Sequence, residues 1–135
     1  MTVVEQIVRR EVDAVILYET DNVIAFLDHD PINLGHALIC PKKPYHDFID
    51  VPEDVMAEIL LVARAIYRKI VKKYSSEGVS LLQNNGSFNE LKHFHLHIFP
   101  RFNNDGFRWV SAEMGLQSMV KLQAEAIGLG DDGFV

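Results

Sequence analysis

The sequence is poor in several features that would place it in a specialised class of proteins. Cys40 is the only cysteine among 135 residues, which excludes an intramolecular disulfide and a cysteine-rich zinc site. No apolar run comes close to the ~20 residues that cross a bilayer, and the opening segment MTVVEQIVRR lacks the hydrophobic stretch of a signal peptide. We therefore expect a cytoplasmic protein that does not act at a membrane.

Positive charge is also scarce. The chain has 13 Lys and Arg residues against 19 Asp and Glu residues, for a formal net charge of -6. The molecule as a whole is therefore not built to bind a nucleic acid polymer, and an anionic small molecule would need a local group of donors. The length and the 48% of hydrophobic residues fit a single domain over 1–135 with an ordinary core.

The hydrophobic pattern alternates between strand-like runs and helical stretches. Thr2 and Glu5 form a capping box before a short helix. The expected elements are a helix at 2–10, strands at 14–19, 22–28 and 36–40, a long helix within 49–78, strands at 79–83 and 93–100, and a helix around 116–127. Short loops between strands favour antiparallel pairing. The sequence thus predicts an α+β fold, with helices packed on one face of an antiparallel sheet of about five strands.

The segment HFHLHIFP, residues 93–100, holds three of the six histidines at every second position. Side chains alternate across a strand, so His93, His95 and His97 should share one face while the apolar residues between them face the core. Three explanations are open: a solvated sheet face, the zinc site of a metal-dependent hydrolase, and metal-free phosphoryl chemistry with a histidine nucleophile. The nearby NNGS loop at 84–87 offers neutral donors for phosphate oxygens and favours the third.

Taken together, these segments resemble the histidine triad (HIT) family. Residues 93–99 match its signature of three histidines alternating with apolar residues, and Pro100-Arg101 resembles the usual continuation. The segment LYETDNVIAFLDHDPINLGHALICPKKPYHDF and the loop QNNG are similar to further family segments, so the likeness covers about 7–101. The resemblance implies an antiparallel sheet with helices, a homodimer, and nucleotide binding with hydrolysis that needs no catalytic metal.

The resemblance also implies a role for each histidine of the site. His95 would be the nucleophile that attacks the α-phosphorus, and His97 would contact the phosphate and assist the leaving group. His93 would orient His95, largely through its backbone carbonyl. His36, in GHALI, matches an additional histidine that supports the triad.

Four polar residues are expected around the nucleotide on the same basis. Asp28, which ends AFLD, would bind the ribose hydroxyls, and Asn84 would hold the phosphate. Asn89 and Glu90 follow in a loop about two residues shorter than usual and complete the expected nucleotide-binding set. No cofactor is implied, and the expected ligand is an adenosine-type nucleotide.

Two further points shape the functional expectation. Zinc-binding relatives carry N-terminal cysteines and a histidine where this chain has Pro44, so we expect no metal site. The third histidine is retained, which favours the hydrolase branches. The leading expectation is a hydrolase that cleaves a nucleoside phosphoramidate or another adenylated substrate through a covalent nucleotidyl-histidine intermediate. A dinucleoside polyphosphate hydrolase, a zinc-dependent hydrolase and a nucleotide-binding protein with vestigial activity stay open as alternatives.

Overall fold

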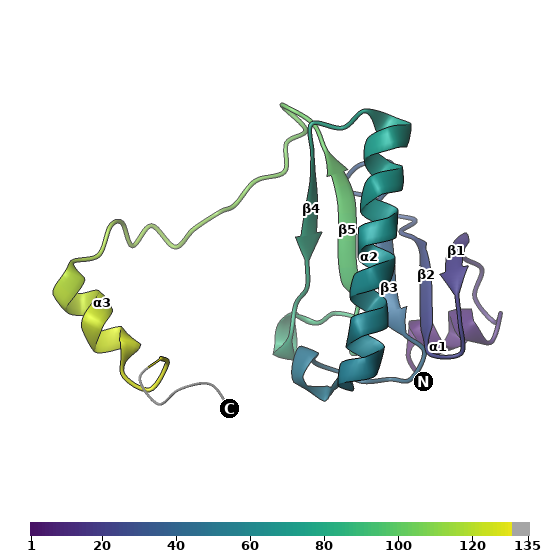
Figure 1. The fold of residues 1–135 in the computed structure, drawn as a ribbon, viewed down its shortest axis with the longest axis horizontal. Helices are drawn as coiled ribbons and strands as arrows, with labels where there is room; N and C mark the ends of the chain where they lie inside the picture. The colour runs from purple at the N-terminus through teal and green to yellow at the C-terminus, as the bar shows by residue number, and fades with distance from the viewer. Residues whose placement is uncertain (131–135) are drawn as a thin grey trace.

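A five-stranded antiparallel sheet forms the centre of the molecule (Figure 1). The computed structural model describes residues 1–130. Its elements are α1 (Val3–Val8), β1 (Ile16–Glu19), β2 (Val23–Leu27), β3 (Ala37–Pro41), η1 (Phe48–Asp50), α2 (Glu53–Tyr74), β4 (Gly78–Leu82), η2 (Gly86–Phe88), β5 (Leu96–Arg101) and α3 (Met119–Ala126). Within these residues the strands follow the order β1-β2-β3-β5-β4, and each neighbouring pair is antiparallel. The fold class expected from the sequence is confirmed.

Different helices cover the two faces of the sheet. On one face, alternate β2 residues such as Val23 and Ala25 belong to the core that packs against α2. On the other face, Ile24 packs with Val4 and Ile7 of α1. The expectation that the helices share one face is therefore wrong for α1. Burying one apolar side chain stabilises the folded state by about 1.5–3 kcal/mol. The helix α1 buries its apolar side by covering the second face of the sheet.

The long helix α2 forms where the pattern predicts it. Glu53 and Asp54 lie in its first turn and Lys72 and Lys73 in its last, an arrangement that complements the helix dipole. Its apolar stripe faces the sheet. The buried residues of the stripe are Val55, Ile59, Val62, Ala63, Ile66 and Ile70.

Close packing between Tyr74 of α2 and Gly35 fixes the chain just before β3. A Cβ atom built on Gly35 would lie 2.5 Å from Cε2 of Tyr74, and Gly35 has a φ of +97°, a conformation that glycine adopts readily. The loop 28–36 is therefore held against the end of α2. This contact places His36 at the start of β3.

The strand β5 begins at Leu96, later than the expected start at His93. The register pairs Ile39 with Leu96, so Pro41 comes opposite Phe94, and proline has no N–H to contribute to a ladder. The Phe94 N–H instead donates to the carbonyl of Tyr45 at 2.7 Å. The alternation of faces still holds, because Phe94 lies in the core beneath α2 and the neighbouring histidines lie on the opposite side.

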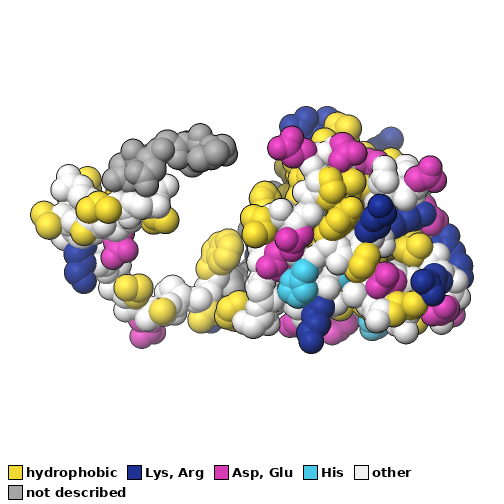
Figure 2. Space-filling view, turned by 90° about the horizontal axis from the view of Figure 1, so that it is seen from below, with side chains coloured by type: hydrophobic (Ala, Val, Ile, Leu, Met, Phe, Trp, Pro, Cys, Tyr) yellow, Lys and Arg dark blue, Asp and Glu magenta, His cyan; other side chains and the backbone are white. Residues whose placement is uncertain are grey.

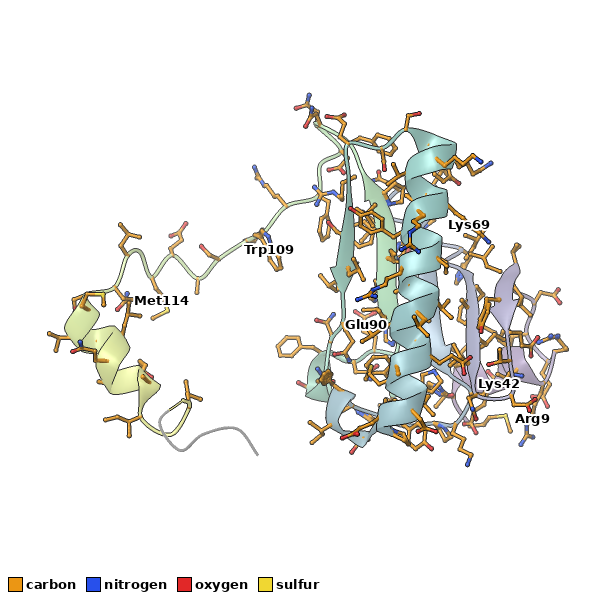
Figure 3. All side chains as sticks on the ribbon, in the orientation of Figure 1. Arg9, Lys42, Lys69, Glu90, Trp109 and Met114 are labelled. Carbon is orange, nitrogen blue, oxygen red and sulfur yellow. The ribbon has the colours of Figure 1, made fainter. Side chains whose placement is uncertain are left out.

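Residues 108–130 form an arm that leaves the body on the β4 side and carries α3 away from the sheet (Figure 1). Every residue of α3 is exposed, so the expected helix is present but packs on neither face. Trp109 and Met114 are 91% and 77% exposed (Figure 3), and apolar side chains lie along the arm (Figure 2). The acidic residues Asp131 and Asp132, which follow in the sequence, lie outside the described residues. Among the helices in 1–130, none has the length and apolar content to cross a membrane.

Candidate active site

Six of the eight residues expected in the site line one cavity on the α1 side of the sheet. The cavity has a volume of about 850 Å³ and is bounded by α1, the ends of β2, β3 and β5, and the loop that follows β4. Strand pairing brings these segments together, because His97 pairs with Leu38 of β3 and with Leu82 of β4. The six residues are His36, His95, His97, Asp28, Asn84 and Glu90.

The backbone of His93 holds the His95 ring in one tautomer. The Nδ1 atom of His95 lies 2.8 Å from the carbonyl oxygen of His93. A carbonyl oxygen only accepts hydrogen bonds, so Nδ1 of the neutral ring carries the hydrogen and Nε2 keeps its lone pair. His95 lines the cavity and is only 5% exposed. The expected contact between the two residues is therefore present, and it leaves the lone pair on Nε2 of His95.

His93 itself lies in the interior and does not line the cavity. It is 0% exposed. Its Nε2 lies 2.7 Å from the carbonyl oxygen of Pro41, and its Nδ1 lies 2.8 Å from the hydroxyl oxygen of Thr2. Burial lowers the pKa of His93 below its usual value, although the hydrogen bond to Pro41 opposes the shift. Both ring nitrogens of His93 are thus engaged within the protein.

His36 and His97 form a hydrogen-bonded pair whose tautomers are also fixed. The backbone N–H of Ile32 donates to Nδ1 of His36 at 3.1 Å, so the ring hydrogen of His36 sits on Nε2. This Nε2 lies 2.9 Å from Nδ1 of His97 and donates to it. His97 then carries its own hydrogen on Nε2, which makes it a hydrogen-bond donor toward the cavity.

Burial keeps both rings of this pair neutral. It lowers the pKa of His97 to about 4, and the nearby rings of His95 and His36 add to the shift. Burial also lowers the pKa of His36, while the carboxylate of Asp28 opposes that shift. The rings of His95 and His97 stand with centroids 4.8 Å apart. The site therefore presents a lone pair and a donor N–H side by side.

Asp28 lies at the end of β2, beside the histidine pair. Its backbone N–H donates to the carbonyl of His36 at 2.9 Å, and its Oδ2 lies 3.7 Å from Nε2 of His36. Its Oδ1 accepts from the backbone N–H of Asp30 at 2.9 Å. The side chain lines the cavity and is 18% exposed, so Oδ2 can accept hydrogen bonds from a ligand.

Asp28, His36 and His97 each offer a donor atom, all within 4.8 Å of one another, which is near enough for one metal ion. The hydrogen bonds argue against this use. For His36 to ligate through Nε2, its hydrogen would have to move to Nδ1, which already faces the N–H of Ile32. The N–H of Ile32 would then lose its acceptor on the ring. The present hydrogen bonds of His36 therefore oppose metal ligation through its Nε2.

The loop after β4 contributes only part of what the sequence suggested. Asn84 and Glu90 line the cavity; Glu90 lies between β4 and β5 (Figure 3). Asn89 does not line it. It is 3% exposed, and its Nδ2 donates to the carbonyl of His46 at 2.8 Å. The structure does not bring Asn89 to this cavity: the loop turns its side chain inward, where it holds the neighbouring segment.

Two residues that the sequence did not signal belong to the surroundings of the site. Thr2, expected only as a helix cap, also contacts His93. Phe107 lines the cavity, and the guanidinium of Arg101 holds it in place by donating to its carbonyl at 2.7 Å. The Asn-Asp-Gly run after Arg101 signals a turn but not the Arg101 contact with Phe107, and the contact between Thr2 and His93 leaves no local pattern because they are 91 positions apart.

Comparisons with known proteins place the chain among named relatives. A family model described as the HIT domain matches residues 9–104. The chain is 36% identical over 123 residues to an adenylylsulfatase of Arabidopsis thaliana, covering 90% of this chain and 61% of that protein. It is 31% identical over 125 residues to an adenosine 5'-monophosphoramidase of Schizosaccharomyces pombe, covering 89% and 91%. A solved HIT family protein from Bacillus anthracis has a TM-score of 0.81 at 28% identity, covering 98% of this chain and 97% of that one.

The fold and the site define a class of proteins in which a row of histidines faces a ligand cavity from one side of an antiparallel sheet. The family model covers well over half of the chain, and the yeast relative is matched over nearly its whole length. The chain belongs to the HIT family, as its sequence resemblance implied.

Proposed function

We propose that the protein is a nucleotide hydrolase that cleaves an adenosine phosphoramidate or another adenylated substrate through a covalent intermediate on His95. One observation carries the proposal. His95 offers a lone pair on Nε2 and His97 offers a hydrogen on Nε2, and hydrogen bonds within the protein fix both states. The relatives named as an adenylylsulfatase and a monophosphoramidase support a nucleotide substrate.

In the first step, Nε2 of His95 attacks the α-phosphorus, so that a P–N bond forms while the bond to the leaving group breaks. The ring of His95 becomes positively charged, and its Nδ1–H bond to the carbonyl of His93 stabilises that charge. His97 donates from Nε2 to a phosphate oxygen, where negative charge develops. An amine leaving group takes up a proton from water. A second water then attacks phosphorus, gives up a proton, and releases the nucleotide and neutral His95.

The rest of the cavity suits a nucleoside. Val3 and Ile7 of α1 line it together with Phe26 and Leu38 of the sheet, and we assign the nucleobase to this apolar end. Asp28 lies beside the histidine pair at the end of β2, where its carboxylate would accept the ribose hydroxyls. This placement sets the α-phosphate next to His95.

The charges around the cavity favour this substrate class over a dinucleoside polyphosphate. Asp13, Asp28, Asp30 and Glu90 line the cavity, and no Lys or Arg is found among its lining residues in the described chain. A polyphosphate bridge carries several negative charges, which this ring of carboxylates would repel. A phosphoramidate or a single adenylyl group brings much less negative charge.

We also propose that the protein acts as a homodimer. The strand β4 is an edge of the sheet and Leu81 on it is 47% exposed; an unpaired, apolar edge favours pairing with another chain. The arm leaves the body on this side (Figure 1). The side chains of the arm are exposed and largely apolar; Leu116 and Val120, for example, are 104% and 76% exposed. A second copy of the protein at this edge would give the arm a surface to cover.

The proposed activity is tested with three substrates that all contain adenosine: adenosine 5'-phosphoramidate, an adenylated amine, and a diadenosine polyphosphate. Wild-type protein should release AMP from the first two with or without EDTA, and the polyphosphate should be cleaved at least about a hundredfold more slowly. His95→Ala is the inactive control. AMP release that EDTA abolishes would support the zinc-dependent alternative instead. Binding of AMP with no turnover of any substrate would support the vestigial alternative.

A further inference from the structure

We infer that Thr2 is a positioning residue for the nucleophile: its hydroxyl holds the ring of His93, and the backbone of His93 in turn holds His95. The inference rests on the proposed function, because it takes His95 as the attacking residue. It concerns a residue at the N-cap of α1, whose capping role alone would require no contact with the triad.

The hydrogen bonds around His93 permit one arrangement only. Its Nε2 lies 2.7 Å from the carbonyl oxygen of Pro41, which can only accept, so Nε2 carries the ring hydrogen and Nδ1 is an acceptor. The partner of Nδ1 is the hydroxyl of Thr2 at 2.8 Å. The hydroxyl therefore donates its single hydrogen to His93. Its oxygen accepts from the backbone N–H of Glu5 at 3.2 Å, so the hydroxyl acts both as a hydrogen-bond donor and as an acceptor.

Two sets of contacts restrain the His93 carbonyl: the ring contacts, and the N–H of Phe94 in the same peptide unit, which donates to the carbonyl of Tyr45 at 2.7 Å. β5 starts only at Leu96, so the backbone of His93 is outside the sheet ladder. The preceding Lys92 has a φ of 56°, a left-handed conformation that non-glycine residues rarely adopt. His93 is 0% exposed, and its ring bridges Thr2 and Pro41. The ring bonds therefore help to hold a stretch of chain whose carbonyl sets the tautomer of His95 at 2.8 Å.

Loss of the Thr2 hydroxyl would leave Nδ1 of His93 without a partner in the interior, at a cost of about 1–3 kcal/mol. The ring would shift toward another partner, and the carbonyl of His93 would move with it. His95 would then lose its fixed Nδ1–H tautomer, and a fraction of the molecules would present N–H rather than a lone pair to phosphorus. The effect falls on the chemical step rather than on nucleotide affinity.

A test has to separate this effect from simple loss of the helix cap, because α1 also lines the cavity through Val3 and Ile7. Glu5→Ala supplies the matched control. Oε1 of Glu5 accepts from the backbone N–H of Thr2 at 3.0 Å, so this change weakens the capping box while the Thr2 hydroxyl keeps its bond to His93. Thr2→Val removes the hydroxyl at nearly constant shape, and Thr2→Ser keeps it.

The experiment measures kcat and KM for adenosine 5'-phosphoramidate, the Kd of AMP by calorimetry, and the imidazole nitrogen shifts of His93 and His95 by NMR. Thr2→Val should lower kcat about tenfold or more, leave the Kd of AMP within about threefold, and average the two nitrogen shifts of His95. Thr2→Ser should restore kcat and the separate shifts of the fixed tautomer. Glu5→Ala should lower Tm and keep kcat within about threefold of wild type.

Two results would overturn the inference: an unchanged kcat with separate His95 shifts in Thr2→Val, or an equal loss of kcat in Glu5→Ala. The NMR measurement needs no turnover. If wild-type protein fails to cleave the phosphoramidate, the proposed function fails, while the His95 shifts in Thr2→Val still decide whether Thr2 positions His95.

Discussion

The Nε2 atom of His36 donates to the Nδ1 atom of His97 across 2.9 Å, and this bond makes the outward nitrogen of His97 a donor. The direction of the bond follows from the backbone N–H of Ile32, which occupies the other nitrogen of His36. His36→Asn should therefore free the tautomer of His97 and lower kcat roughly 10- to 100-fold, with little change in the Kd of AMP.

Steady-state kinetics and the imidazole nitrogen shifts of His97 check this prediction. The matched control is His46→Asn, because His46 pairs with Asp47 and is not among the residues that line the cavity. Wild-type kcat in His36→Asn, or an equal loss in His46→Asn, would contradict the proposal that His36 fixes the tautomer of His97.

Asp28→Ala should weaken nucleotide binding more than it lowers stability. A carboxylate that accepts ribose hydroxyls makes charge-assisted hydrogen bonds, each contributing about 1.5–3 kcal/mol, so the Kd of AMP should rise at least about tenfold. A dideoxyribose analogue should bind wild type and variant equally. Calorimetry with Asp30→Ala, a change at a second carboxylate of the cavity, provides the comparison. Unchanged affinity with a lowered Tm would assign Asp28 a structural role only.

Folding stability should decrease as the pH falls below the ordinary histidine pKa of about 6.5. Burial lowers the pKa of His36, His93 and His97 in the folded protein, that of His97 to about 4. At a pH between the ordinary histidine pKa and the lowered pKa of the folded protein, the unfolded chain binds more protons than the folded one. The free energy of unfolding is therefore greatest above the ordinary pKa and falls with acid, by up to about 1.4 kcal/mol per pH unit for each histidine.

Urea unfolding between neutral pH and pH 5 measures this slope. In His97→Asn, the free energy of unfolding should change less steeply with pH, because one buried histidine no longer contributes. The control is His29→Asn, a change at an exposed histidine, which should keep the wild-type slope. Equal slopes in wild type and His97→Asn would show that His97 does not stay neutral in the fold.

Light scattering at micromolar concentration should give twice the chain mass of 15.4 kDa. Leu81→Arg should reduce the dimer fraction, since Leu81 is 47% exposed on the edge strand β4 and two charged side chains would meet there. Leu17→Arg is the matched control on the opposite edge, where Leu17 is 46% exposed. Truncation after Phe107, which removes the arm, should also weaken the dimer. A monomer mass for wild type would refute the dimer.

The sequence predicted the parts of the site that depend on local patterns. The shared face of His95 and His97 follows from the alternation of side chains along an extended chain, and it holds even though β5 starts only at Leu96. The loop residue Asn84 lies near the histidines because β4 and β5 pair, as their patterns suggested. Neither conclusion needs information about distant residues.

The remaining features depend on contacts that no local pattern records. The tautomers of the histidines are set by Ile32 and Pro41, whose backbone groups meet the rings only after folding. Asn89 turns inward because its amide satisfies the carbonyl of His46. The position of α1 on the second sheet face follows from where its apolar side finds cover, and a helical pattern gives the apolar side without giving its partner.

The account depends most on the claim that His95 carries the nucleotide during turnover. Rapid quenching of wild-type protein with a labelled adenylated substrate, followed by mass spectrometry, tests it directly. The label should lie on His95 within HFHLHIFP, in an acid-labile, base-stable P–N bond, and His95→Ala should bind AMP but take up no label. Label on His93 or His97, or substantial turnover by His95→Ala, would contradict the account.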